Sequence, residues 1–267
     1  MPIAPSLLAL VGETPLVYLN KVGAGLGARI AVKLETRNPL ASVKDRIGLA
    51  IVEAAERDGL LKPGGTLVEA TSGNTGIALA WVGAVKAYRV VLVMPDTMSI
   101  ERRKLLAALG ATLELSPGSE GMAGAVRRAE EIARTTPGAI LARQFENAAN
   151  PAAHRKGTAE EIWRDSEGKV DVFVAAVGTG GTLTGAGGRL KELKPGLRVV
   201  AVEPAESPLL SQGKAGPHKI QGIGANFVPP ILDRTVADEI ETVTAHEAGE
   251  ISRRLAREEG ILCGISA

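Results

Sequence analysis

Short apolar runs alternate with helical patterns along the chain. The runs are rich in β-branched residues and predict strands at residues 29–34, 66–70, 89–94, 112–115, 170–177 and 198–203. Helices are expected in the intervals between these strands. Such alternation is typical of parallel sheets that are covered by helices on both faces, so the pattern predicts an α/β protein.

Three of the expected helices have recognisable ends, at residues 43–58, 99–109 and 244–259. Each is followed by a glycine, the residue that most easily adopts the left-handed conformation ending a helix, at Gly59, Gly110 and Gly260. Ser99 is the expected N-cap of the second helix. The third is preceded by the spacing of a capping box, formed by Thr244 and Glu247.

Composition indicates a globular protein. The 267 residues fit one large domain or two small ones, and 45% hydrophobic with 23% charged residues is typical of a chain with a packed core. Two lobes that share one cleft are expected. The net charge of +1 provides no field that would attract nucleic acid or an anionic membrane, so neither is an expected partner.

Compartment and metal content are also constrained by the sequence. A single cysteine, Cys263, excludes an intrachain disulfide framework and a multi-cysteine metal site, and it fits a reducing compartment. Capping or surface roles are expected for the three histidines, which lack metal spacing: His154, His218 and His246. Apolar stretches such as 77–85 are far shorter than the roughly 18 residues that span a membrane. Because no Lys or Arg precedes Lys21, the charged start of a signal peptide is missing, and a cytoplasmic protein is expected.

Lys44 is the first candidate for chemistry. Ser42 is positioned to cap a helix and Asp45 to complete a capping box, which places Lys44 in the first helical turn. The partial positive charge of a helix N-terminus disfavours an ammonium group and favours a neutral amine suited to Schiff-base chemistry. A lone lysine is more often a solvated surface residue, so this hypothesis depends on the surrounding segments.

Residues 71–76, Thr-Ser-Gly-Asn-Thr-Gly, follow an expected strand and open an expected helix. Such a turn directs several backbone N–H groups and small hydroxyls at one point, which is how a helix N-terminus binds an anion. A substrate carboxylate fits this description. Ordinary capping of a tight turn is an equally good interpretation of these residues alone.

Residues 178–185, Gly-Thr-Gly-Gly-Thr-Leu-Thr-Gly, again lie between a strand and a helix. The glycines permit close approach of the backbone to a phosphate, and the threonines add donors without adding charge. A dinucleotide fingerprint is disfavoured because Leu183 stands where its third glycine belongs, although Glu203 resembles the ribose-binding acid of that fold. A P-loop is excluded, since no Gly-Lys-Ser or Gly-Lys-Thr follows.

These three segments, in this order, closely resemble the pyridoxal-phosphate-dependent enzymes of fold type II, and within them the cysteine synthases (O-acetylserine sulfhydrylases). The resemblance covers nearly the whole chain. Four further segments look like the same subfamily, at residues 12–16, 94–103, 144–145 and 218–224. The implied fold is a two-lobed, three-layer αβα architecture with mostly parallel sheets.

The resemblance implies a role for each matching position. Lys44 would hold pyridoxal 5'-phosphate as a Schiff base and remove the substrate α-proton. Asn74 would bond the ring oxygen of the cofactor, and its phosphate would be bound by Gly178, Thr179, Gly180, Gly181 and Thr182. The amino-acid substrate would be bound by Thr71, Ser72, Gly73, Thr75, Gln144 and Gly222. No metal is implied.

The resemblance also implies an organisation and partners. Residues 1–36 and 149–267 would form a large phosphate-binding domain, and residues 37–148 a small mobile domain with the carboxylate loop. The substrates would be O-acetylserine and sulfide. A homodimer is expected, together with association with the C-terminal tail of serine acetyltransferase. The family continues beyond Ala267 with a Ser or Thr that bonds the pyridine nitrogen, so a longer chain is expected and no residue here is assigned that role.

Several alternatives stay open at this point. A serine or threonine dehydratase and a cystathionine β-synthase share the lysine and the phosphate loop. A nicotinamide-dependent dehydrogenase would use the 178–185 loop differently, and a non-catalytic relative would keep the fold without turnover. The acyl donor, acetylserine or phosphoserine, and the nucleophile, sulfide or thiosulfate, are not distinguished by these residues. The segment expected to be a solvated helix face is Glu101, Arg102, Arg103 and Lys104.

Overall fold

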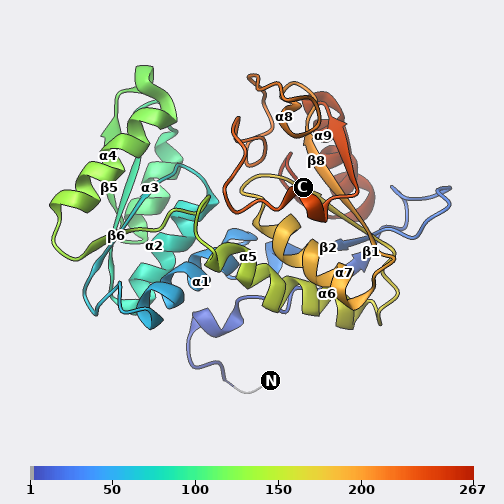
Figure 1. Cartoon of the computed structure of the whole chain (residues 1–267), viewed down its shortest axis with the longest axis horizontal. Coiled ribbons are helices and arrows are strands. Elements are labelled where there is room, and N and C mark those ends of the chain that lie inside the picture. Colours follow the sequence, from blue (N-terminus) through green and yellow to red (C-terminus); the bar gives the residue numbers. More distant parts are fainter. Residues whose placement is uncertain (1–2) are drawn as a thin grey trace. The chain divides into compact units, whose positions relative to one another are not determined.

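The computed structural model describes residues 3–267 and divides the chain into two compact units (Figure 1). The first unit comprises the chain up to Val11 together with Asn38–Ala149, and the second comprises Gly12–Arg37 and Asn150–Ala267. Both units are α/β, and the sheets are mostly parallel. The fold class predicted from the sequence is therefore confirmed.

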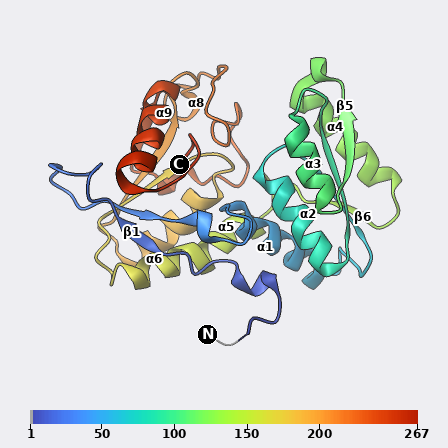
Figure 2. The same cartoon turned by 180° about the vertical axis from the view of Figure 1, so that it is seen from behind.

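The first unit is built in three layers. Its sheet has the order β5–β4–β3–β6 and is parallel throughout, with strands β3 (Thr66–Ala70), β4 (Arg89–Pro95), β5 (Thr112–Ser116) and β6 (Ala139–Leu141). One face is covered by α1 (Lys44–Arg57), α2 (Asn74–Lys86) and α3 (Ile100–Ala108), and the other by α4 (Gly121–Thr135) (Figure 2). Short 3-10 turns occur at η1 (Leu7–Leu10) and η3 (Gly118–Glu120).

The two faces of β3 have separate cores because successive strand residues point to opposite sides. Leu67 packs with Ile47 and Ile51 of α1, and all three are buried. Val68 packs on the other side against Ala125 of α4. A strand that is buried on both faces has room for a charged side chain only where hydrogen bonds compensate it, which makes Glu69 on the same strand notable.

The second unit has a three-stranded parallel sheet in the order β7–β8–β9, with strands β7 (Val172–Ala176), β8 (Arg198–Pro204) and β9 (Glu239–Val243). An antiparallel pair is formed by β1 (Leu16–Tyr18) and β2 (Ala31–Lys33). Its helices are α5 (Ala149–Ala153), which begins at the last residue of the first unit, α6 (Ala159–Asp165), α7 (Gly188–Leu193), α8 (Leu209–Gln212) and α9 (Ala245–Arg254).

Three helices of this unit contain a π-helical segment, at η4 (His154–Thr158), η5 (Leu183–Gly187) and η7 (Leu255–Glu259). Short 3-10 turns occur at η2 (Glu35–Arg37) and η6 (Arg234–Val236). The segments η4 and η5 pack against each other. Because π-helical turns are rare and often occur at functional sites, this pair draws attention to the loop before η5.

Five of the six predicted strands lie in the parallel sheets, within two residues of their predicted ends. The strand predicted at 29–34 does not belong to a parallel sheet, because β2 pairs antiparallel with β1, with Val17 opposite Val32. Three strands were not predicted: β1, β6 and β9. β1 and β6 are three residues long, too short for a periodic signal to appear, and β9, Glu-Ile-Glu-Thr-Val, lacks the apolar run that marks the other strands.

Most of the predicted helix ends are confirmed. Ser99 accepts the Arg102 N–H at 3.4 Å, Thr244 and Glu247 form the capping box, and the three glycines have positive φ. The box expected of Ser42 and Asp45 is wrong. The Asp45 carboxylate accepts the Leu40 N–H at 2.7 Å instead of reaching Ser42, although α1 still begins at Lys44.

The packing of α2 on β4 gives a test of this fold. A Cβ on Gly83 would overlap Val90 and lie 3.3 Å from the Tyr88 carbonyl oxygen. We expect Gly83→Ala to lower the free energy of unfolding by about 1 to 3 kcal/mol, although alanine is ordinarily the better helix former. Urea unfolding measures this quantity.

The matched control is Gly188→Ala in α7, where the nearest atom outside the helix, in Val236, lies 3.6 Å from the added Cβ. This variant should be at least as stable as the unmodified protein. Equal stability of the two variants would contradict the close packing of α2 on β4.

Candidate active site

The turn between β3 and α2 is held rigidly. The Thr71 hydroxyl accepts the Gly73 N–H at 3.2 Å, and the Ser72 carbonyl accepts an N–H of the Arg102 guanidinium at 2.7 Å. The peptide between Ser72 and Gly73 is thus fixed on both sides. The N–H groups of Asn74 and Thr75, the first two residues of α2, have no partner inside the helix. Such N–H groups at the start of a helix are suitable donors for an anion.

Gln144 joins this turn from a distant part of the sequence. It follows β6, and its side-chain oxygen accepts the Thr75 hydroxyl at 2.6 Å. Both residues are buried, at 2% exposure for Thr75 and 6% for Gln144, whereas Asn74 is exposed. The structure therefore brings together two of the residues that were expected to bind the substrate carboxylate.

Glu69 of β3 holds Gln144 in place through hydrogen bonds. Its carboxylate accepts the backbone N–H of Arg143 at 2.8 Å and that of Gln144 at 3.4 Å, and it also bonds the Gln144 side chain. Arg143 has a φ of 53°, a left-handed conformation that these bonds help to maintain. Burial outweighs the hydrogen bonds and raises the pKa of Glu69 to about 7.

Lys44 is the first residue of α1, and its backbone N–H donates to the Ser42 hydroxyl at 3.1 Å. Helices α1 and α2 approach closely where a Cβ on Gly48 would lie 2.7 Å from that of Ala78. Gly48 and Ala78 each lie about one turn after the first residue of their helix. Short connections join both helices to β3, and both helices run antiparallel to that strand. Lys44 and Asn74 therefore begin two neighbouring helices.

The second group of predicted residues is the loop 178–182 of the second unit. The Thr179 hydroxyl accepts the side-chain amide of Asn150 at 3.0 Å and the Gly181 N–H at 3.3 Å. Gly180 has a φ of 83°, which only glycine adopts without strain. A helix opens at Gly181 and continues through η5 into α7.

Glycine is required in this loop for packing as well. A Cβ on Gly178 would overlap the carbonyl oxygen of Gly222, and one on Gly181 would overlap the side chain of Asn150. Gly222, itself exposed, therefore lies against the loop, while its expected contact with the substrate stays a prediction. Bare backbone, two threonine hydroxyls and a helix N-terminus fit a phosphate dianion, because all of them donate and none is negatively charged.

His154 was expected in a capping or surface role, and this is wrong. Its side chain is buried, with Nε2 3.3 Å from the Thr182 hydroxyl and Nδ1 2.9 Å from the Thr158 hydroxyl. Both partners can donate or accept, so a neutral imidazole satisfies both bonds. The histidine joins η4 to the 178–182 loop.

The prediction of a solvated face for Glu101–Lys104 is wrong for two of its residues. Glu101 and Lys104 are exposed, but Arg102 is half-buried on the Ser72 carbonyl and Arg103 donates to the Asp96 carbonyl. Four consecutive charged residues give no sequence signal that distinguishes the inward pair. Glu69 did carry a signal, since a carboxylate inside an apolar strand requires compensation.

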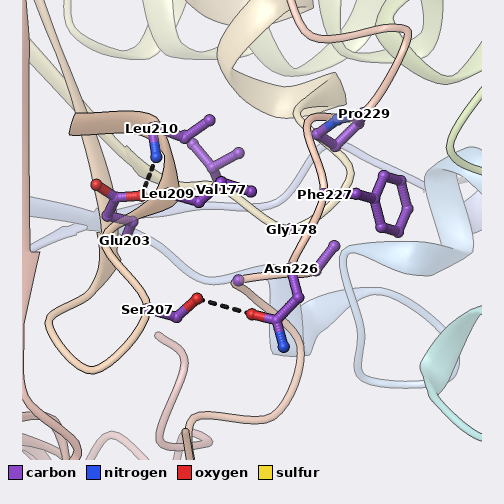
Figure 3. Close-up of a pocket in the computed structure, with 11 residues that line it drawn as sticks. Val177, Gly178, Glu203, Ser207, Leu209, Leu210, Asn226, Phe227 and Pro229 are labelled. Carbon is purple, nitrogen blue, oxygen red and sulfur yellow. Dashed lines mark hydrogen bonds between the residues drawn. The ribbon is translucent and has the colours of Figure 1, made fainter. Parts of the chain in front are cut away.

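Glu203 does not behave as a ribose-binding acid. Its carboxylate accepts the N–H of Leu210 at 2.7 Å (Figure 3). It also accepts the Ser211 N–H at 2.9 Å and the Ser211 hydroxyl at 2.6 Å, so it caps the start of α8. The cavity beside it, about 20 Å³, holds no more than a water molecule. This removes the feature that favoured a dinucleotide.

The described part of the chain contains neither a metal-binding cluster nor a membrane-spanning helix. Within residues 3–267, no group of three or more His, Cys, Asp or Glu side chains is arranged to hold a metal ion. None of the helices described there combines the length and apolarity that crossing a bilayer requires.

Comparisons with known proteins agree on one family. The family described as "Pyridoxal-phosphate dependent enzyme" matches residues 7–267. "Cysteine synthase A" of Escherichia coli (strain K12) is 54% identical over 266 residues, which is 96% of this chain and 81% of that protein. The crystal structure of cysteine synthase from Entamoeba histolytica has a TM-score of 0.95 at 47% identity and covers 99% of this chain and 79% of its own.

A second solved structure, of O-ureido-L-serine synthase, has a TM-score of 0.96 at 50% identity. It covers all of this chain and 84% of its own. The structural similarity extends over both units of the chain and includes enzymes that are named for different products.

The raised pKa of Glu69 predicts a pH dependence of stability. The carboxyl ionises near 4.5 when unfolded and near 7 when folded, so the folded state binds the proton more tightly. The free energy of unfolding should fall as pH rises between these values, by about 3 kcal/mol. Glu69→Gln removes this contribution. Urea unfolding of both proteins across this pH range should show the variant gaining relative stability; parallel pH profiles would refute the assignment.

Proposed function

This chain belongs to the family of pyridoxal-phosphate dependent enzymes, and we propose that it acts as a cysteine synthase, replacing the acetoxy group of O-acetyl-L-serine by sulfide. The products are L-cysteine and acetate. One observation carries the proposal: Lys44 begins a helix beside the 71–75 turn, whose Thr75 is bonded to Gln144. A reactive amine and a carboxylate-binding turn are thereby placed in one unit.

When bound, pyridoxal phosphate withdraws electrons from the substrate α-carbon and stabilises the charge left by the departing α-proton. Lys44 would hold the cofactor covalently and, once released by the substrate amine, take that proton. The start of a helix suits this role because the local field favours the neutral amine. Asn74, which is exposed at the start of the neighbouring helix α2, would donate its side-chain amide to the ring oxygen.

The cofactor phosphate would be bound by Gly178, Thr179, Gly180, Gly181 and Thr182. Helix-initial N–H groups and hydroxyls hold a dianion without a lysine or arginine, because several fixed dipoles act on it together. Asn150 and His154 support the loop from behind through Thr179 and Thr182. They are positioning residues.

The substrate carboxylate would be bound by the turn that contains Thr71, Ser72, Gly73 and Thr75, with Gln144 beside it. Gly222 is proposed as a further substrate-binding residue. Binding there orients the amino acid so that its α-hydrogen faces one base. In the reaction the bond from the β-carbon to the acetoxy oxygen breaks and a bond to the sulfide sulfur forms. Acetate carries away the electron pair, and sulfide supplies the new one.

The organisation and assembly of the protein are proposed on the same resemblance, and its location on the single cysteine, which fits a reducing compartment. The unit with the 178–182 loop would be the large cofactor-binding domain, and the unit with the 71–75 turn the small mobile one. A cytoplasmic homodimer is proposed, which binds the C-terminal tail of serine acetyltransferase.

The proposed activity predicts a specific effect of removing Lys44. The purified protein with pyridoxal phosphate should be yellow and should form cysteine from O-acetylserine and sulfide. Lys44→Ala should lose more than about 99% of this activity, since covalent catalysis by the amine is lost. Cysteine formation and visible absorbance measure both effects, and Lys62→Ala, at an exposed lysine, is the control.

The same assay distinguishes the alternatives. Pyruvate or ketobutyrate released without sulfide would indicate a dehydratase, and a colourless protein that binds NAD would indicate a dehydrogenase. Parallel reactions with O-phosphoserine and with thiosulfate identify the acyl donor and the nucleophile. Cysteine formation by Lys44→Ala at the normal rate would overturn the proposed role of this lysine.

Arg102 gives a test of the carboxylate turn. Its guanidinium fixes the Ser72 carbonyl, and hydrogen bonds from charged groups contribute about 1.5 kcal/mol. Arg102→Ala should therefore raise the KM for O-acetylserine about tenfold, with kcat changed much less. Lys104→Ala, exposed on the same helix, should leave both constants unchanged. An unchanged KM in Arg102→Ala would contradict the positioning role.

A further inference from the structure

A chain of hydrogen bonds runs from the carboxylate turn to a buried acid, all within the first unit. The Thr75 hydroxyl donates to the Gln144 side-chain oxygen at 2.6 Å, and the Gln144 side chain bonds the carboxylate of Glu69. All three residues are at most 6% exposed. The chain therefore exchanges protons with solvent only when the structure opens or a group in it changes state.

The direction of donation along this chain is fixed by Glu69. An ionised carboxylate only accepts, so the Gln144 amide must present its NH₂ to Glu69 and its oxygen to Thr75. The Thr75 hydroxyl then donates its single proton to the Gln144 oxygen. With Glu69 ionised, every donor in the chain points toward Glu69 and away from the turn.

A carboxylate that arrives at the turn needs the opposite direction, because it too only accepts. The Thr75 hydroxyl, which lies beside its own helix-initial N–H, can donate to it only after releasing Gln144. The Gln144 amide must then turn its NH₂ toward Thr75, and Glu69 must supply a proton to the Gln144 oxygen. This chain of hydrogen bonds therefore accommodates one negative charge, either on Glu69 or on the ligand at the turn.

We propose that binding of the amino-acid carboxylate to the 71–75 turn is coupled to the uptake of one proton from solvent by Glu69. This inference rests on the proposed function, which assigns the substrate carboxylate to that turn. The proton comes from water or buffer and forms the O–H bond of Glu69, and it returns to solvent when the ligand leaves. Glu69 is thus a positioning residue whose charge reports whether the turn is occupied.

The electrostatics of Glu69 favour this exchange. Its pKa of about 7 means that protonation near neutral pH costs little, and a second carboxylate nearby would raise that pKa further. Glu146 on the adjoining turn adds to the same effect, while the Arg143 guanidinium is directed at Glu146 at 2.8 Å. The helices on this face of β3 carry the charged residues Lys44, Asp45, Arg46, Glu53, Glu56, Arg57, Lys86, Glu101, Arg102, Arg103 and Lys104.

The test is calorimetric binding of L-serine to the holoenzyme, in two buffers of different ionisation enthalpy, at about pH 8. The difference in heat between the buffers gives the number of protons taken up. The unmodified protein should take up close to one proton more than Glu69→Gln, whose side-chain amide supplies the N–H that a protonated Glu69 would supply. Between about pH 7.5 and 8.5 the affinity of the unmodified protein for L-serine should fall up to tenfold more than the affinity of Glu69→Gln.

A second variant keeps the test independent of any folding effect at position 69. Gln144→Met breaks the chain, so Thr75 can donate to the ligand whatever the state of Glu69, and the extra proton uptake should disappear there also. Equal proton uptake in all three proteins, or loss of L-serine binding at every pH in Glu69→Gln with an unchanged circular dichroism spectrum, would overturn the inference. If the unmodified holoenzyme does not bind L-serine at all, the proposed function fails with it.

Discussion

Both units depend on one constraint: the N–H groups at the start of a helix that follows a strand need an acceptor from outside the helix. In each unit a strand stops, three or four residues turn, and a helix begins whose first donors have no partner inside it. The turn 71–73 and the loop 178–180 are the two cases that matter here. An anion is the natural acceptor for such donors, so the same local geometry is available to a carboxylate in one unit and a phosphate in the other.

A turn that must present its N–H groups to a ligand cannot satisfy itself, and the protein fixes each turn by buried polar groups behind it. Glu69 and Arg102 hold the first from below and from the side, and Asn150 and His154 hold the second. Arg102, Asn150 and His154 bond a peptide or hydroxyl of the turn directly, so they fix its shape without occupying the helix-initial N–H donors. Glu69 acts on the first turn through Gln144, whose side-chain oxygen accepts the Thr75 hydroxyl. Rigid donors lose little entropy on binding, which is the physical advantage of this arrangement.

Contiguous motifs were easier to single out in the sequence than the residues that support them. Thr71, Asn74 and the 178–182 loop lie in such motifs and were singled out by the resemblance to a known family, and their ligand contacts stay predictions. Arg102 and His154 were misjudged because their partners, Ser72 and Thr182, are 30 and 28 residues away and no periodicity connects them. The same limit applied to β6 and β9, whose pairing is set by neighbouring strands and not by their own pattern.

Neutral donors have a consequence for charge that cationic ones would not have. A lysine or arginine in the turn would neutralise an arriving carboxylate, and a nearby buried acid would then stay ionised as the partner of that cation. With only N–H groups and hydroxyls in the turn, a new negative charge is stabilised by dipoles whose orientation depends on the groups behind them. The Glu69 carboxylate sets that orientation through Gln144 and Thr75, so its own charge and the charge of the ligand compete for the same donors.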